Sequence, residues 1–214
     1  MMPEFTRQSP SPRYVEMLDL YKRMHRHGDT RNNLPAEKTF DGHSLGPHVP
    51  AITRLLASYG ARSLTDYGCG KAIGYTDAVI VGHDGKQHKG LLQYWSPIAI
   101  TLYDPGNPQH DAYPEKQTDA VISTDVLEHI PAEDIPWVLD SMFSLARRFV
   151  YLSIACYAAA KSLPSGENAH ITQKSPGWWL DQIEAAAIKH GRMDYHGAIF
   201  ATRTHRIDIG CRNA

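Results

Sequence analysis

The chain has 214 residues, of which 42% are hydrophobic and 21% charged, and its formal net charge is −1. This length suits one domain with a full hydrophobic core, and the composition is that of a globular protein. A near-neutral charge gives no general attraction to a long nucleic acid or an anionic membrane, so extended nucleic acid is not expected as a partner. No apolar run approaches the ~20 residues of a membrane span, and the polar N-terminal segment lacks the apolar core of a signal peptide. We therefore expect a cytoplasmic protein with no membrane partner.

Cysteine and histidine usage points to the kind of chemistry to look for. Cys69, Cys156 and Cys211 show no CxxC spacing, which suits a reducing compartment and excludes a disulfide framework or a four-cysteine zinc site. The 12 histidines are many for this length and direct attention to metal or proton chemistry, although at least half of them are expected to be ordinary surface residues.

The first third of the chain is expected to form two helices and one strand. Residues 1–12 are expected to be a loose arm, and apolar side chains at helical spacing predict a helix over 14–25. A second amphipathic pattern predicts a helix over 47–59. Residues 63–67 are expected to form a short strand that runs into a glycine turn, and a helix is expected to start near Lys71.

The middle of the chain alternates between strands and helices. Residues 82–97 contain several glycines and are expected to be an irregular insertion. Apolar runs at 98–103, 119–123 and 149–155 are typical of buried strands, and a helix is expected over 132–146.

The C-terminal part is expected to contain one helix, over 176–190, and two strands, over 198–202 and 205–209. Alternating strands and helices predict an α/β fold, with a doubly wound, mostly parallel, Rossmann-like sheet to which the last strands add an antiparallel C-terminal edge. Ligands bind such sheets outside the carboxyl ends of the strands, which is where the sequence motifs lie.

The first motif is the run from Asp66 through Tyr67, Gly68 and Cys69 to Gly70. Glycine is needed where a strand turns sharply into a helix, although an ordinary tight turn would also explain two glycines. With an aspartate two positions before the first glycine, the run resembles the first motif of class I S-adenosylmethionine (SAM) dependent methyltransferases. The resemblance implies that Asp66, Gly68, Cys69 and Gly70 bind SAM. A nicotinamide enzyme would more usually show GxGxxG, whose third spacing is absent here.

The second motif is Asp104, at the end of the strand expected over 98–103. In dinucleotide and SAM enzymes an acid at this strand tip accepts hydrogen bonds from ribose hydroxyls, and the alternative is a turn aspartate before Pro105. Gly70 and Asp104 are 34 positions apart, more than the usual ~20, and we assign the excess to the insertion at 82–97. Between Asp104 and Asp119 there is too little chain for a helix and a strand, so one strand of the standard sheet is expected to be missing.

The third motif covers residues 118–131 and resembles the fourth-strand signature of the same family, a buried strand followed by an acid and a short turn ending in His and Pro. The family resemblance spans roughly residues 45–190. It implies a SAM-dependent methyltransferase domain at 46–214, preceded at 1–45 by an arm and a helical lid, with Asp125 expected to contact the cofactor.

Asp125, Glu128 and His129 stand at positions i, i+3 and i+4 and would share one face of a helical turn. Two carboxylates and an imidazole suit a divalent cation such as Mg²⁺ or Mn²⁺. The pattern resembles the acid-x-x-Glu-His motif of two metal-using groups, the ubiquinone-biosynthesis O-methyltransferases and the small-RNA 3′-terminal 2′-O-methyltransferases. In the RNA enzymes a later histidine completes the metal site, and that position matches His170 here.

Several functions remain open on the sequence alone. Metal-free methyltransferases carry similar motifs, in which the histidine is a general base or only packs, so His129 is expected to be a base, a metal ligand or a structural residue. The leading expectation is O-methylation of a hydroxyl on a small molecule, a sugar or a ribose, so the acceptor would be a small molecule, a carbohydrate or a nucleotide. The alternatives are a 2′-O-methyltransferase for an RNA terminus, a SAM-binding or partner-binding protein without catalysis and, more distantly, a nicotinamide oxidoreductase.

Overall fold

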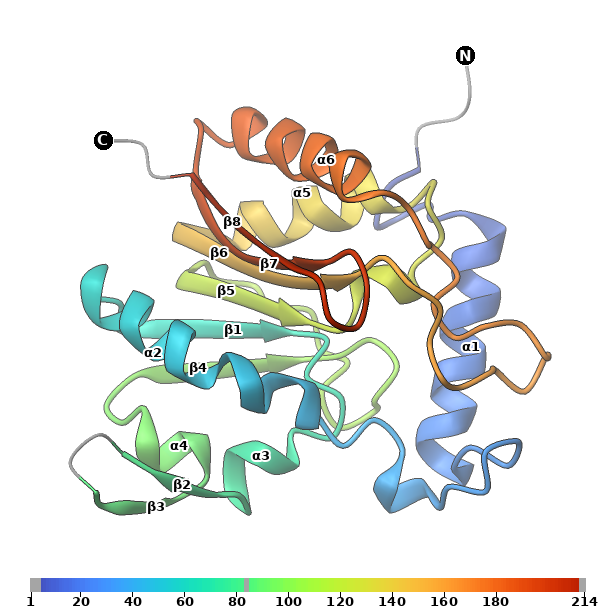
Figure 1. Cartoon of the computed structure of the whole chain (residues 1–214), viewed down its shortest axis with the longest axis horizontal. Coiled ribbons are helices and arrows are strands. Elements are labelled where there is room, and N and C mark those ends of the chain that lie inside the picture. The colour runs from blue at the N-terminus through green and yellow to red at the C-terminus, as the bar shows by residue number, and fades with distance from the viewer. Residues whose placement is uncertain (1–4, 83–84, 212–214) are drawn as a thin grey trace.

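A single six-stranded sheet organises the fold in the computed structural model, which describes residues 5–82 and 85–211 (Figure 1). The strand order is β4-β1-β5-β6-β7-β8, and all neighbours pair in parallel except β7 and β8. The fold is therefore the expected mostly parallel, Rossmann-like α/β fold with an antiparallel C-terminal edge. The strands are β1 (Ser63–Tyr67), β4 (Ala99–Tyr103), β5 (Thr118–Thr124), β6 (Ala146–Ala155), β7 (Asp194–Phe200) and β8 (Arg206–Cys211).

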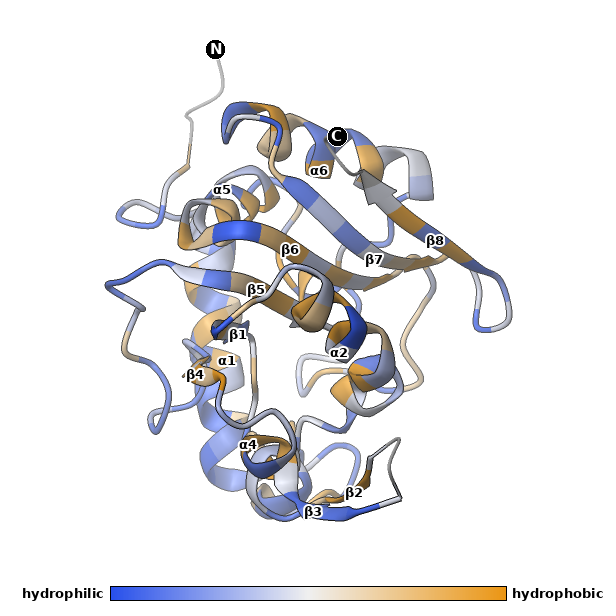
Figure 2. Cartoon of the chain, turned by 90° about the vertical axis from the view of Figure 1, so that its left-hand side faces the viewer, coloured by the Kyte–Doolittle hydropathy of each residue, from blue (hydrophilic) through white to orange (hydrophobic). Residues whose placement is uncertain are grey.

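Helices cover both faces of the sheet. On one face α5 (Ile135–Leu145) and α6 (Pro176–Lys189) lie side by side, and α2 (Val49–Ser58) lies on the other (Figure 1). Successive strand residues serve opposite faces, so Val121 packs in the core cluster of α5 and α6, whereas Ile122 packs in the cluster of α2. Figure 2 shows hydrophobic residues over most of β5 and β6, as expected for strands buried on both faces.

The N-terminal helix α1 (Pro12–His27) lies at the end of the sheet toward which the parallel strands point (Figure 1). The Ser11 side chain caps it by accepting a hydrogen bond from the Tyr14 N–H, and the Ser11 N–H and hydroxyl both donate to Asp134. The rings of Tyr14 and Trp137 meet edge to face at 5.0 Å. These contacts fix α1 against the segment that leads into α5.

The expectation of a loose arm at 1–12 is wrong for residues 5–11, and residues 1–4 lie outside the described part of the chain. Phe5 packs against the main core cluster, and the guanidinium of Arg7 lies 3.9 Å from the centre of the Tyr113 ring. The segment is therefore held by hydrophobic and cation–π contacts that a short polar sequence does not reveal.

The insertion also differs from the expectation of irregular structure. Residues 79–94 form a hairpin of β2 (Val79–Val81) and β3 (Gln87–Lys89) followed by α4 (Gly90–Tyr94), with residues 83 and 84 outside the description. The helix expected near Lys71 is the single turn α3 (Ile73–Thr76).

Two of the longer helices are shorter than expected, for local reasons. The helix expected over 47–59 begins only at Val49, because a 3₁₀ helix, His43–His48, precedes it. The helix expected over 132–146 is α5, which ends at Leu145 because Ala146 already pairs with Thr118 as the first residue of β6. Other short 3₁₀ helices are Ala36–Lys38 and Leu127–His129.

The chain between β4 and β5, residues 104–117, is described throughout and forms neither helix nor strand, so β4 is an edge strand and the missing strand is confirmed. None of the helices in the described part of the chain combines the length and apolar character needed to cross a membrane.

Candidate functional site

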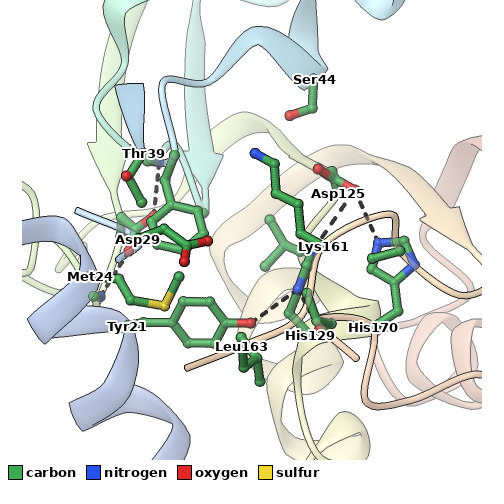
Figure 3. Close-up of a pocket in the computed structure, with 18 of the residues that line it drawn as sticks. Tyr21, Met24, Asp29, Thr39, Ser44, Asp125, His129, Lys161, Leu163 and His170 are labelled. Carbon is green, nitrogen blue, oxygen red and sulfur yellow. Dashed lines mark hydrogen bonds and ion pairs between the residues drawn. The ribbon is translucent and has the colours of Figure 1, made fainter. Parts of the chain in front are cut away.

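A cavity of about 460 Å³ lies between α1 and the carboxyl ends of the central strands, a size within the usual range for small-molecule sites. Its wall includes six of the residues singled out in the sequence and also segments from α1, residues 34–44 and residues 157–163 (Figure 3). The six are Gly68, Gly70, Asp104, Asp125, His129 and His170. The side chains of Asp66, Cys69 and Glu128 are not part of the wall.

Two positions of the glycine turn, 68 and 70, require glycine. Gly68 has φ +91°, and a Cβ there would lie 2.3 Å from Val126 Cγ2. Gly70 has φ +58°, and a Cβ there would lie 2.4 Å from the carbonyl oxygen of Phe40. Both conformations are unfavourable for residues with a side chain. The turn therefore depends on close backbone approach, as the sequence predicts.

Every backbone N–H from Gly68 to Ile73 donates a hydrogen bond within the protein. Gly68 and Cys69 donate to the Tyr103 carbonyl, and Gly70 donates to Asp104 Oδ2 at 2.8 Å. The next three N–H groups donate to the carbonyls of Phe40, Cys69 and Asp41. The turn thus has no N–H to offer a pyrophosphate, which dinucleotide sites bind through such donors.

Asp66 and Cys69 lie behind the turn. Asp66 is only 4% exposed, and its carboxylate accepts a hydrogen bond of 2.7 Å from the Tyr75 hydroxyl. Burial raises the pKa of Asp66 to about 7, against the opposing effect of that hydrogen bond. The Cys69 thiol is also buried, and burial raises its pKa. Both side chains support the shape of the turn from the interior.

Asp104 connects two strand ends and faces the cavity. Its Oδ1 accepts a hydrogen bond from the Gly106 N–H at 2.8 Å, which is the contact expected of a turn aspartate before Pro105. Its Oδ2 accepts a hydrogen bond from the Gly70 N–H and so joins the tip of β4 to the turn after β1. Burial raises its pKa, although these backbone hydrogen bonds favour the charged form. Because a carboxylate oxygen can accept two hydrogen bonds, each oxygen keeps capacity for a ligand hydroxyl.

Asp125, His129 and His170 form a compact group in which one ligand atom of each lies within 4.8 Å of the others. Asp125 Oδ1 is 4.0 Å from His129 Nε2 and 3.8 Å from His170 Nε2 (Figure 3). Asp125 has φ +61°, a strained conformation for a residue other than glycine, and its side chain is 53% exposed. The distances exceed hydrogen-bond length and leave space for an ion between the three groups.

Backbone carbonyls orient both imidazoles. His129 Nδ1 lies 2.8 Å from the Ala169 carbonyl oxygen, and His170 Nδ1 lies 2.6 Å from that of Tyr157. A carbonyl only accepts, so both rings donate through Nδ1, and each neutral ring keeps its lone pair on Nε2, which faces Asp125. Burial lowers the pKa of His129 despite the attraction of Asp125, which favours this neutral form. Histidines that bind metals are commonly oriented by such carbonyl contacts.

Glu128 does not share a face with Asp125 and His129 as the helical spacing predicts. Asp125 precedes the 3₁₀ helix in a left-handed conformation, so the three residues do not lie on one α-helical turn. The Glu128 side chain is buried, and its Oε1 accepts from the Ala155 N–H at 2.6 Å. Burial, together with the charge of Asp125, raises the pKa of Glu128 to about 8. In the structure the third member of the group is His170 rather than Glu128.

Two residues at the site lie outside the three sequence motifs: Tyr21 belongs to the helix expected as a lid, and Lys161 is one of the basic residues that the sequence offers to a phosphate. The Tyr21 hydroxyl, from α1, lies 3.1 Å from His129 Nδ1, and Lys161 extends into the cavity beside Asp125 (Figure 3). A tyrosine on an amphipathic helix and a lysine in a loop are ordinary in their positions, so only the fold reveals their proximity to the group.

Comparisons of this chain with protein-family models, with curated proteins and with solved structures give no match. The fold and the site define a Rossmann-like α/β protein with a cavity at the carboxyl ends of its parallel strands.

Proposed function

We propose that this chain is a SAM-dependent O-methyltransferase that acts at the group formed by Asp125, His129 and His170. The observation that carries the proposal is the convergence on one cavity of the glycine turn, of Asp104 and of this group. A cofactor end and a reactive end within one small cavity are what transfer between two bound molecules requires, because alignment of the reactants supplies much of the rate.

The cofactor end suits an adenosyl group better than a dinucleotide. The turn at Gly68 and Gly70 brings backbone close to the cavity, and Asp104 can accept hydrogen bonds from ribose hydroxyls. Since the N–H groups of the turn are all engaged within the protein, a pyrophosphate would find no donors there. SAM carries a sulfonium and no pyrophosphate, so it has no need of them.

The reactive end has the donors of a divalent metal site. Two Nε2 lone pairs and one carboxylate oxygen converge there, and a set of two imidazoles and a carboxylate suits Mn²⁺, Fe²⁺ or Zn²⁺ better than Mg²⁺, which prefers oxygen ligands. A divalent ion at this position would lower the pKa of an acceptor hydroxyl. Without an ion, His129 Nε2 is a base with its lone pair directed into the cavity.

In the proposed reaction the acceptor oxygen forms a bond to the methyl carbon of SAM as the carbon–sulfur bond breaks. The electron pair of that bond stays on sulfur, which becomes the neutral thioether of S-adenosylhomocysteine. The hydroxyl proton passes to His129 Nε2, or to water in the open cavity when His129 binds an ion. The protein's task is therefore to align the two reactants and to remove one proton.

The test begins with calorimetry of SAM, S-adenosylhomocysteine and NAD. We expect binding of the first two and none of NAD; binding of NAD alone would refute the proposal. Labelled SAM is then incubated with sugars, nucleotides, catechols and RNA ends, with and without EDTA. We expect His129→Ala to lower methyl transfer by ~100-fold or more while SAM affinity changes only a few fold, the range for a lost base. The matched control, His205→Ala, alters an exposed histidine outside the cavity.

A further inference from the structure

The cavity has a cationic rim beside the group of Asp125, His129 and His170. Lys161, in the loop after β6, extends between Ser44 and Asp125 (Figure 3). Among the described residues its ammonium makes no hydrogen bond and no ion pair, although its charge acts on Asp41. A lysine directed into a cavity without a bonded partner is available to a ligand.

A second cation, Arg203, reaches the same region from the turn between β7 and β8. Its guanidinium lies 5.1 Å from the centre of the Tyr157 ring, and the carbonyl of Tyr157 is the one that orients His170. Arg203 also donates to the Ala158 carbonyl at 3.4 Å, and within 5–82 and 85–211 it forms no salt bridge. We call the part of the cavity lined by Asp125, His129, His170, Lys161 and Arg203 the acceptor end.

The other carboxylates of the cavity already have partners. Asp29 accepts from the backbone and side chain of Asn32, and Asp104 accepts from two backbone N–H groups. Asp41 is paired with His43 at 2.7 Å. Partial burial opposes ionisation of Asp41, yet its pKa is lowered because hydrogen bonds from His43 and, more weakly, the charge of Lys161 favour the carboxylate. These acids therefore neutralise the acceptor end only in part.

We propose that the methyl acceptor is a small hydroxylated compound that carries an oxyanion, a phosphate or a carboxylate, bound by Lys161 and Arg203. This inference rests on the proposed function. With a divalent ion held at the group, the positive charge of the ion, Lys161 and Arg203 exceeds the negative charge of Asp125 and Asp41 beside them, so the acceptor end is positive. An acceptor with an oxyanion complements that charge and is oriented with its hydroxyl toward His129.

A small acceptor fits the molecule better than an RNA backbone does. The formal net charge of the chain is −1, and binding of a long phosphate backbone depends on many cationic contacts. The cavity is covered on one side by α1, whose Tyr21 contacts His129. The space beside the group is thus limited to a compound of modest size.

The experiment measures binding of inorganic phosphate and of citrate to the full chain saturated with S-adenosylhomocysteine, by calorimetry. We expect millimolar or tighter binding, weakened about tenfold or more by Lys161→Gln or Arg203→Gln, as for loss of a charge-assisted hydrogen bond. Lys116→Gln, which removes an exposed lysine outside the cavity, is the matched control and should bind as the unchanged protein does. Affinity for SAM should be the same in all four proteins.

The outcomes separate the two proposals. If neither anion binds, or both bind equally to the Lys161 and Arg203 variants, the inference is overturned while SAM binding still stands. If Lys161→Gln weakens SAM binding instead, the lysine serves the donor carboxylate, and the inference is again overturned. If S-adenosylhomocysteine does not bind, the proposed function itself fails.

Methyl transfer is then compared between matched neutral and anionic acceptors: glucose with glucose 6-phosphate and glucuronate, and glycerol with glycerol 3-phosphate and glycerate. Transfer confined to anionic members supports the inference, and the favoured member tells phosphate from carboxylate. Preferential transfer to the neutral members, or transfer to a short RNA but to none of these compounds, overturns it.

Discussion

The buried carboxyl group of Asp66 predicts a pH-dependent instability of the ligand-free protein. Its pKa is raised from 3.8 to about 7, mainly by burial, so the unfolded chain releases this proton at lower pH than the folded protein does. The contribution of Asp66 to stability is fully present below about pH 4 and is lost as the pH rises to about 7. A shift of this size means that the free energy of unfolding is lower above pH 7 than below pH 4 by roughly 4 kcal/mol, as far as Asp66 contributes to it.

The perturbation is Asp66→Asn, which keeps an oxygen to accept from the Tyr75 hydroxyl but cannot ionise. Between pH 4 and pH 8 the free energy of unfolding should fall further for the wild-type protein than for the variant. We expect the difference between the two falls to be as much as about 4 kcal/mol, and the variant to be the more stable protein at pH 8. Urea denaturation followed by circular dichroism at several pH values provides the measurement. Asp181→Asn, on the exposed side of α6, is the control and should follow the wild-type curve. Parallel curves for Asp66→Asn and wild type would refute the reasoning.

Three further predictions concern the turn, the helix α1 and the metal group. Gly70→Ala should destabilise the protein by about 2 kcal/mol or more and abolish SAM binding, because the added Cβ meets the Phe40 carbonyl at a positive φ; both are measurable by denaturation and calorimetry. Ser11→Ala should cost about 1–2 kcal/mol in urea denaturation, since it removes the helix cap and a hydrogen bond to Asp134. His170→Ala should weaken Mn²⁺ or Zn²⁺ binding at least tenfold in a metal titration, because it removes one of three ligand atoms; unchanged affinity would remove the proposed metal centre.

The sequence predicted those helices and strands whose hydrophobic pattern is strong within the segment itself. Strand β1 has the bounds expected from its sequence, and α1 and α6 differ by at most two residues at each end. The hairpin β2–β3 was missed because its strands have only three residues each, too few to show a period, and the outward-facing Val79 and Val81 do not mark a buried strand.

The candidate site was only partly predictable, for reasons of backbone conformation. Asp125 and His129 were expected together from their spacing, but the exclusion of Glu128 depends on the positive φ of Asp125, which no local pattern indicates for an aspartate. His170 lies 41 positions beyond His129, and its orientation depends on the carbonyl of Tyr157, a contact between loops. The family resemblance matched His170 to a metal site, and the fold adds that its Nε2 faces Asp125 at 3.8 Å.

Burial sorts the four acids at the strand ends into two pairs. Asp66 and Glu128 face the interior, where burial raises the pKa of each, to about 7 and about 8, so near neutral pH Asp66 is about half protonated and Glu128 is mostly protonated. Asp104 and Asp125 open onto the cavity, one beside the glycine turn and one beside the two histidines. Asp125, whose carboxylate lies beside both imidazoles, is therefore the anion available to a cation held by His129 and His170. The same sorting explains why mutation of Asp66 should act mainly on stability, whereas mutation of Asp125 should act on metal binding and methyl transfer.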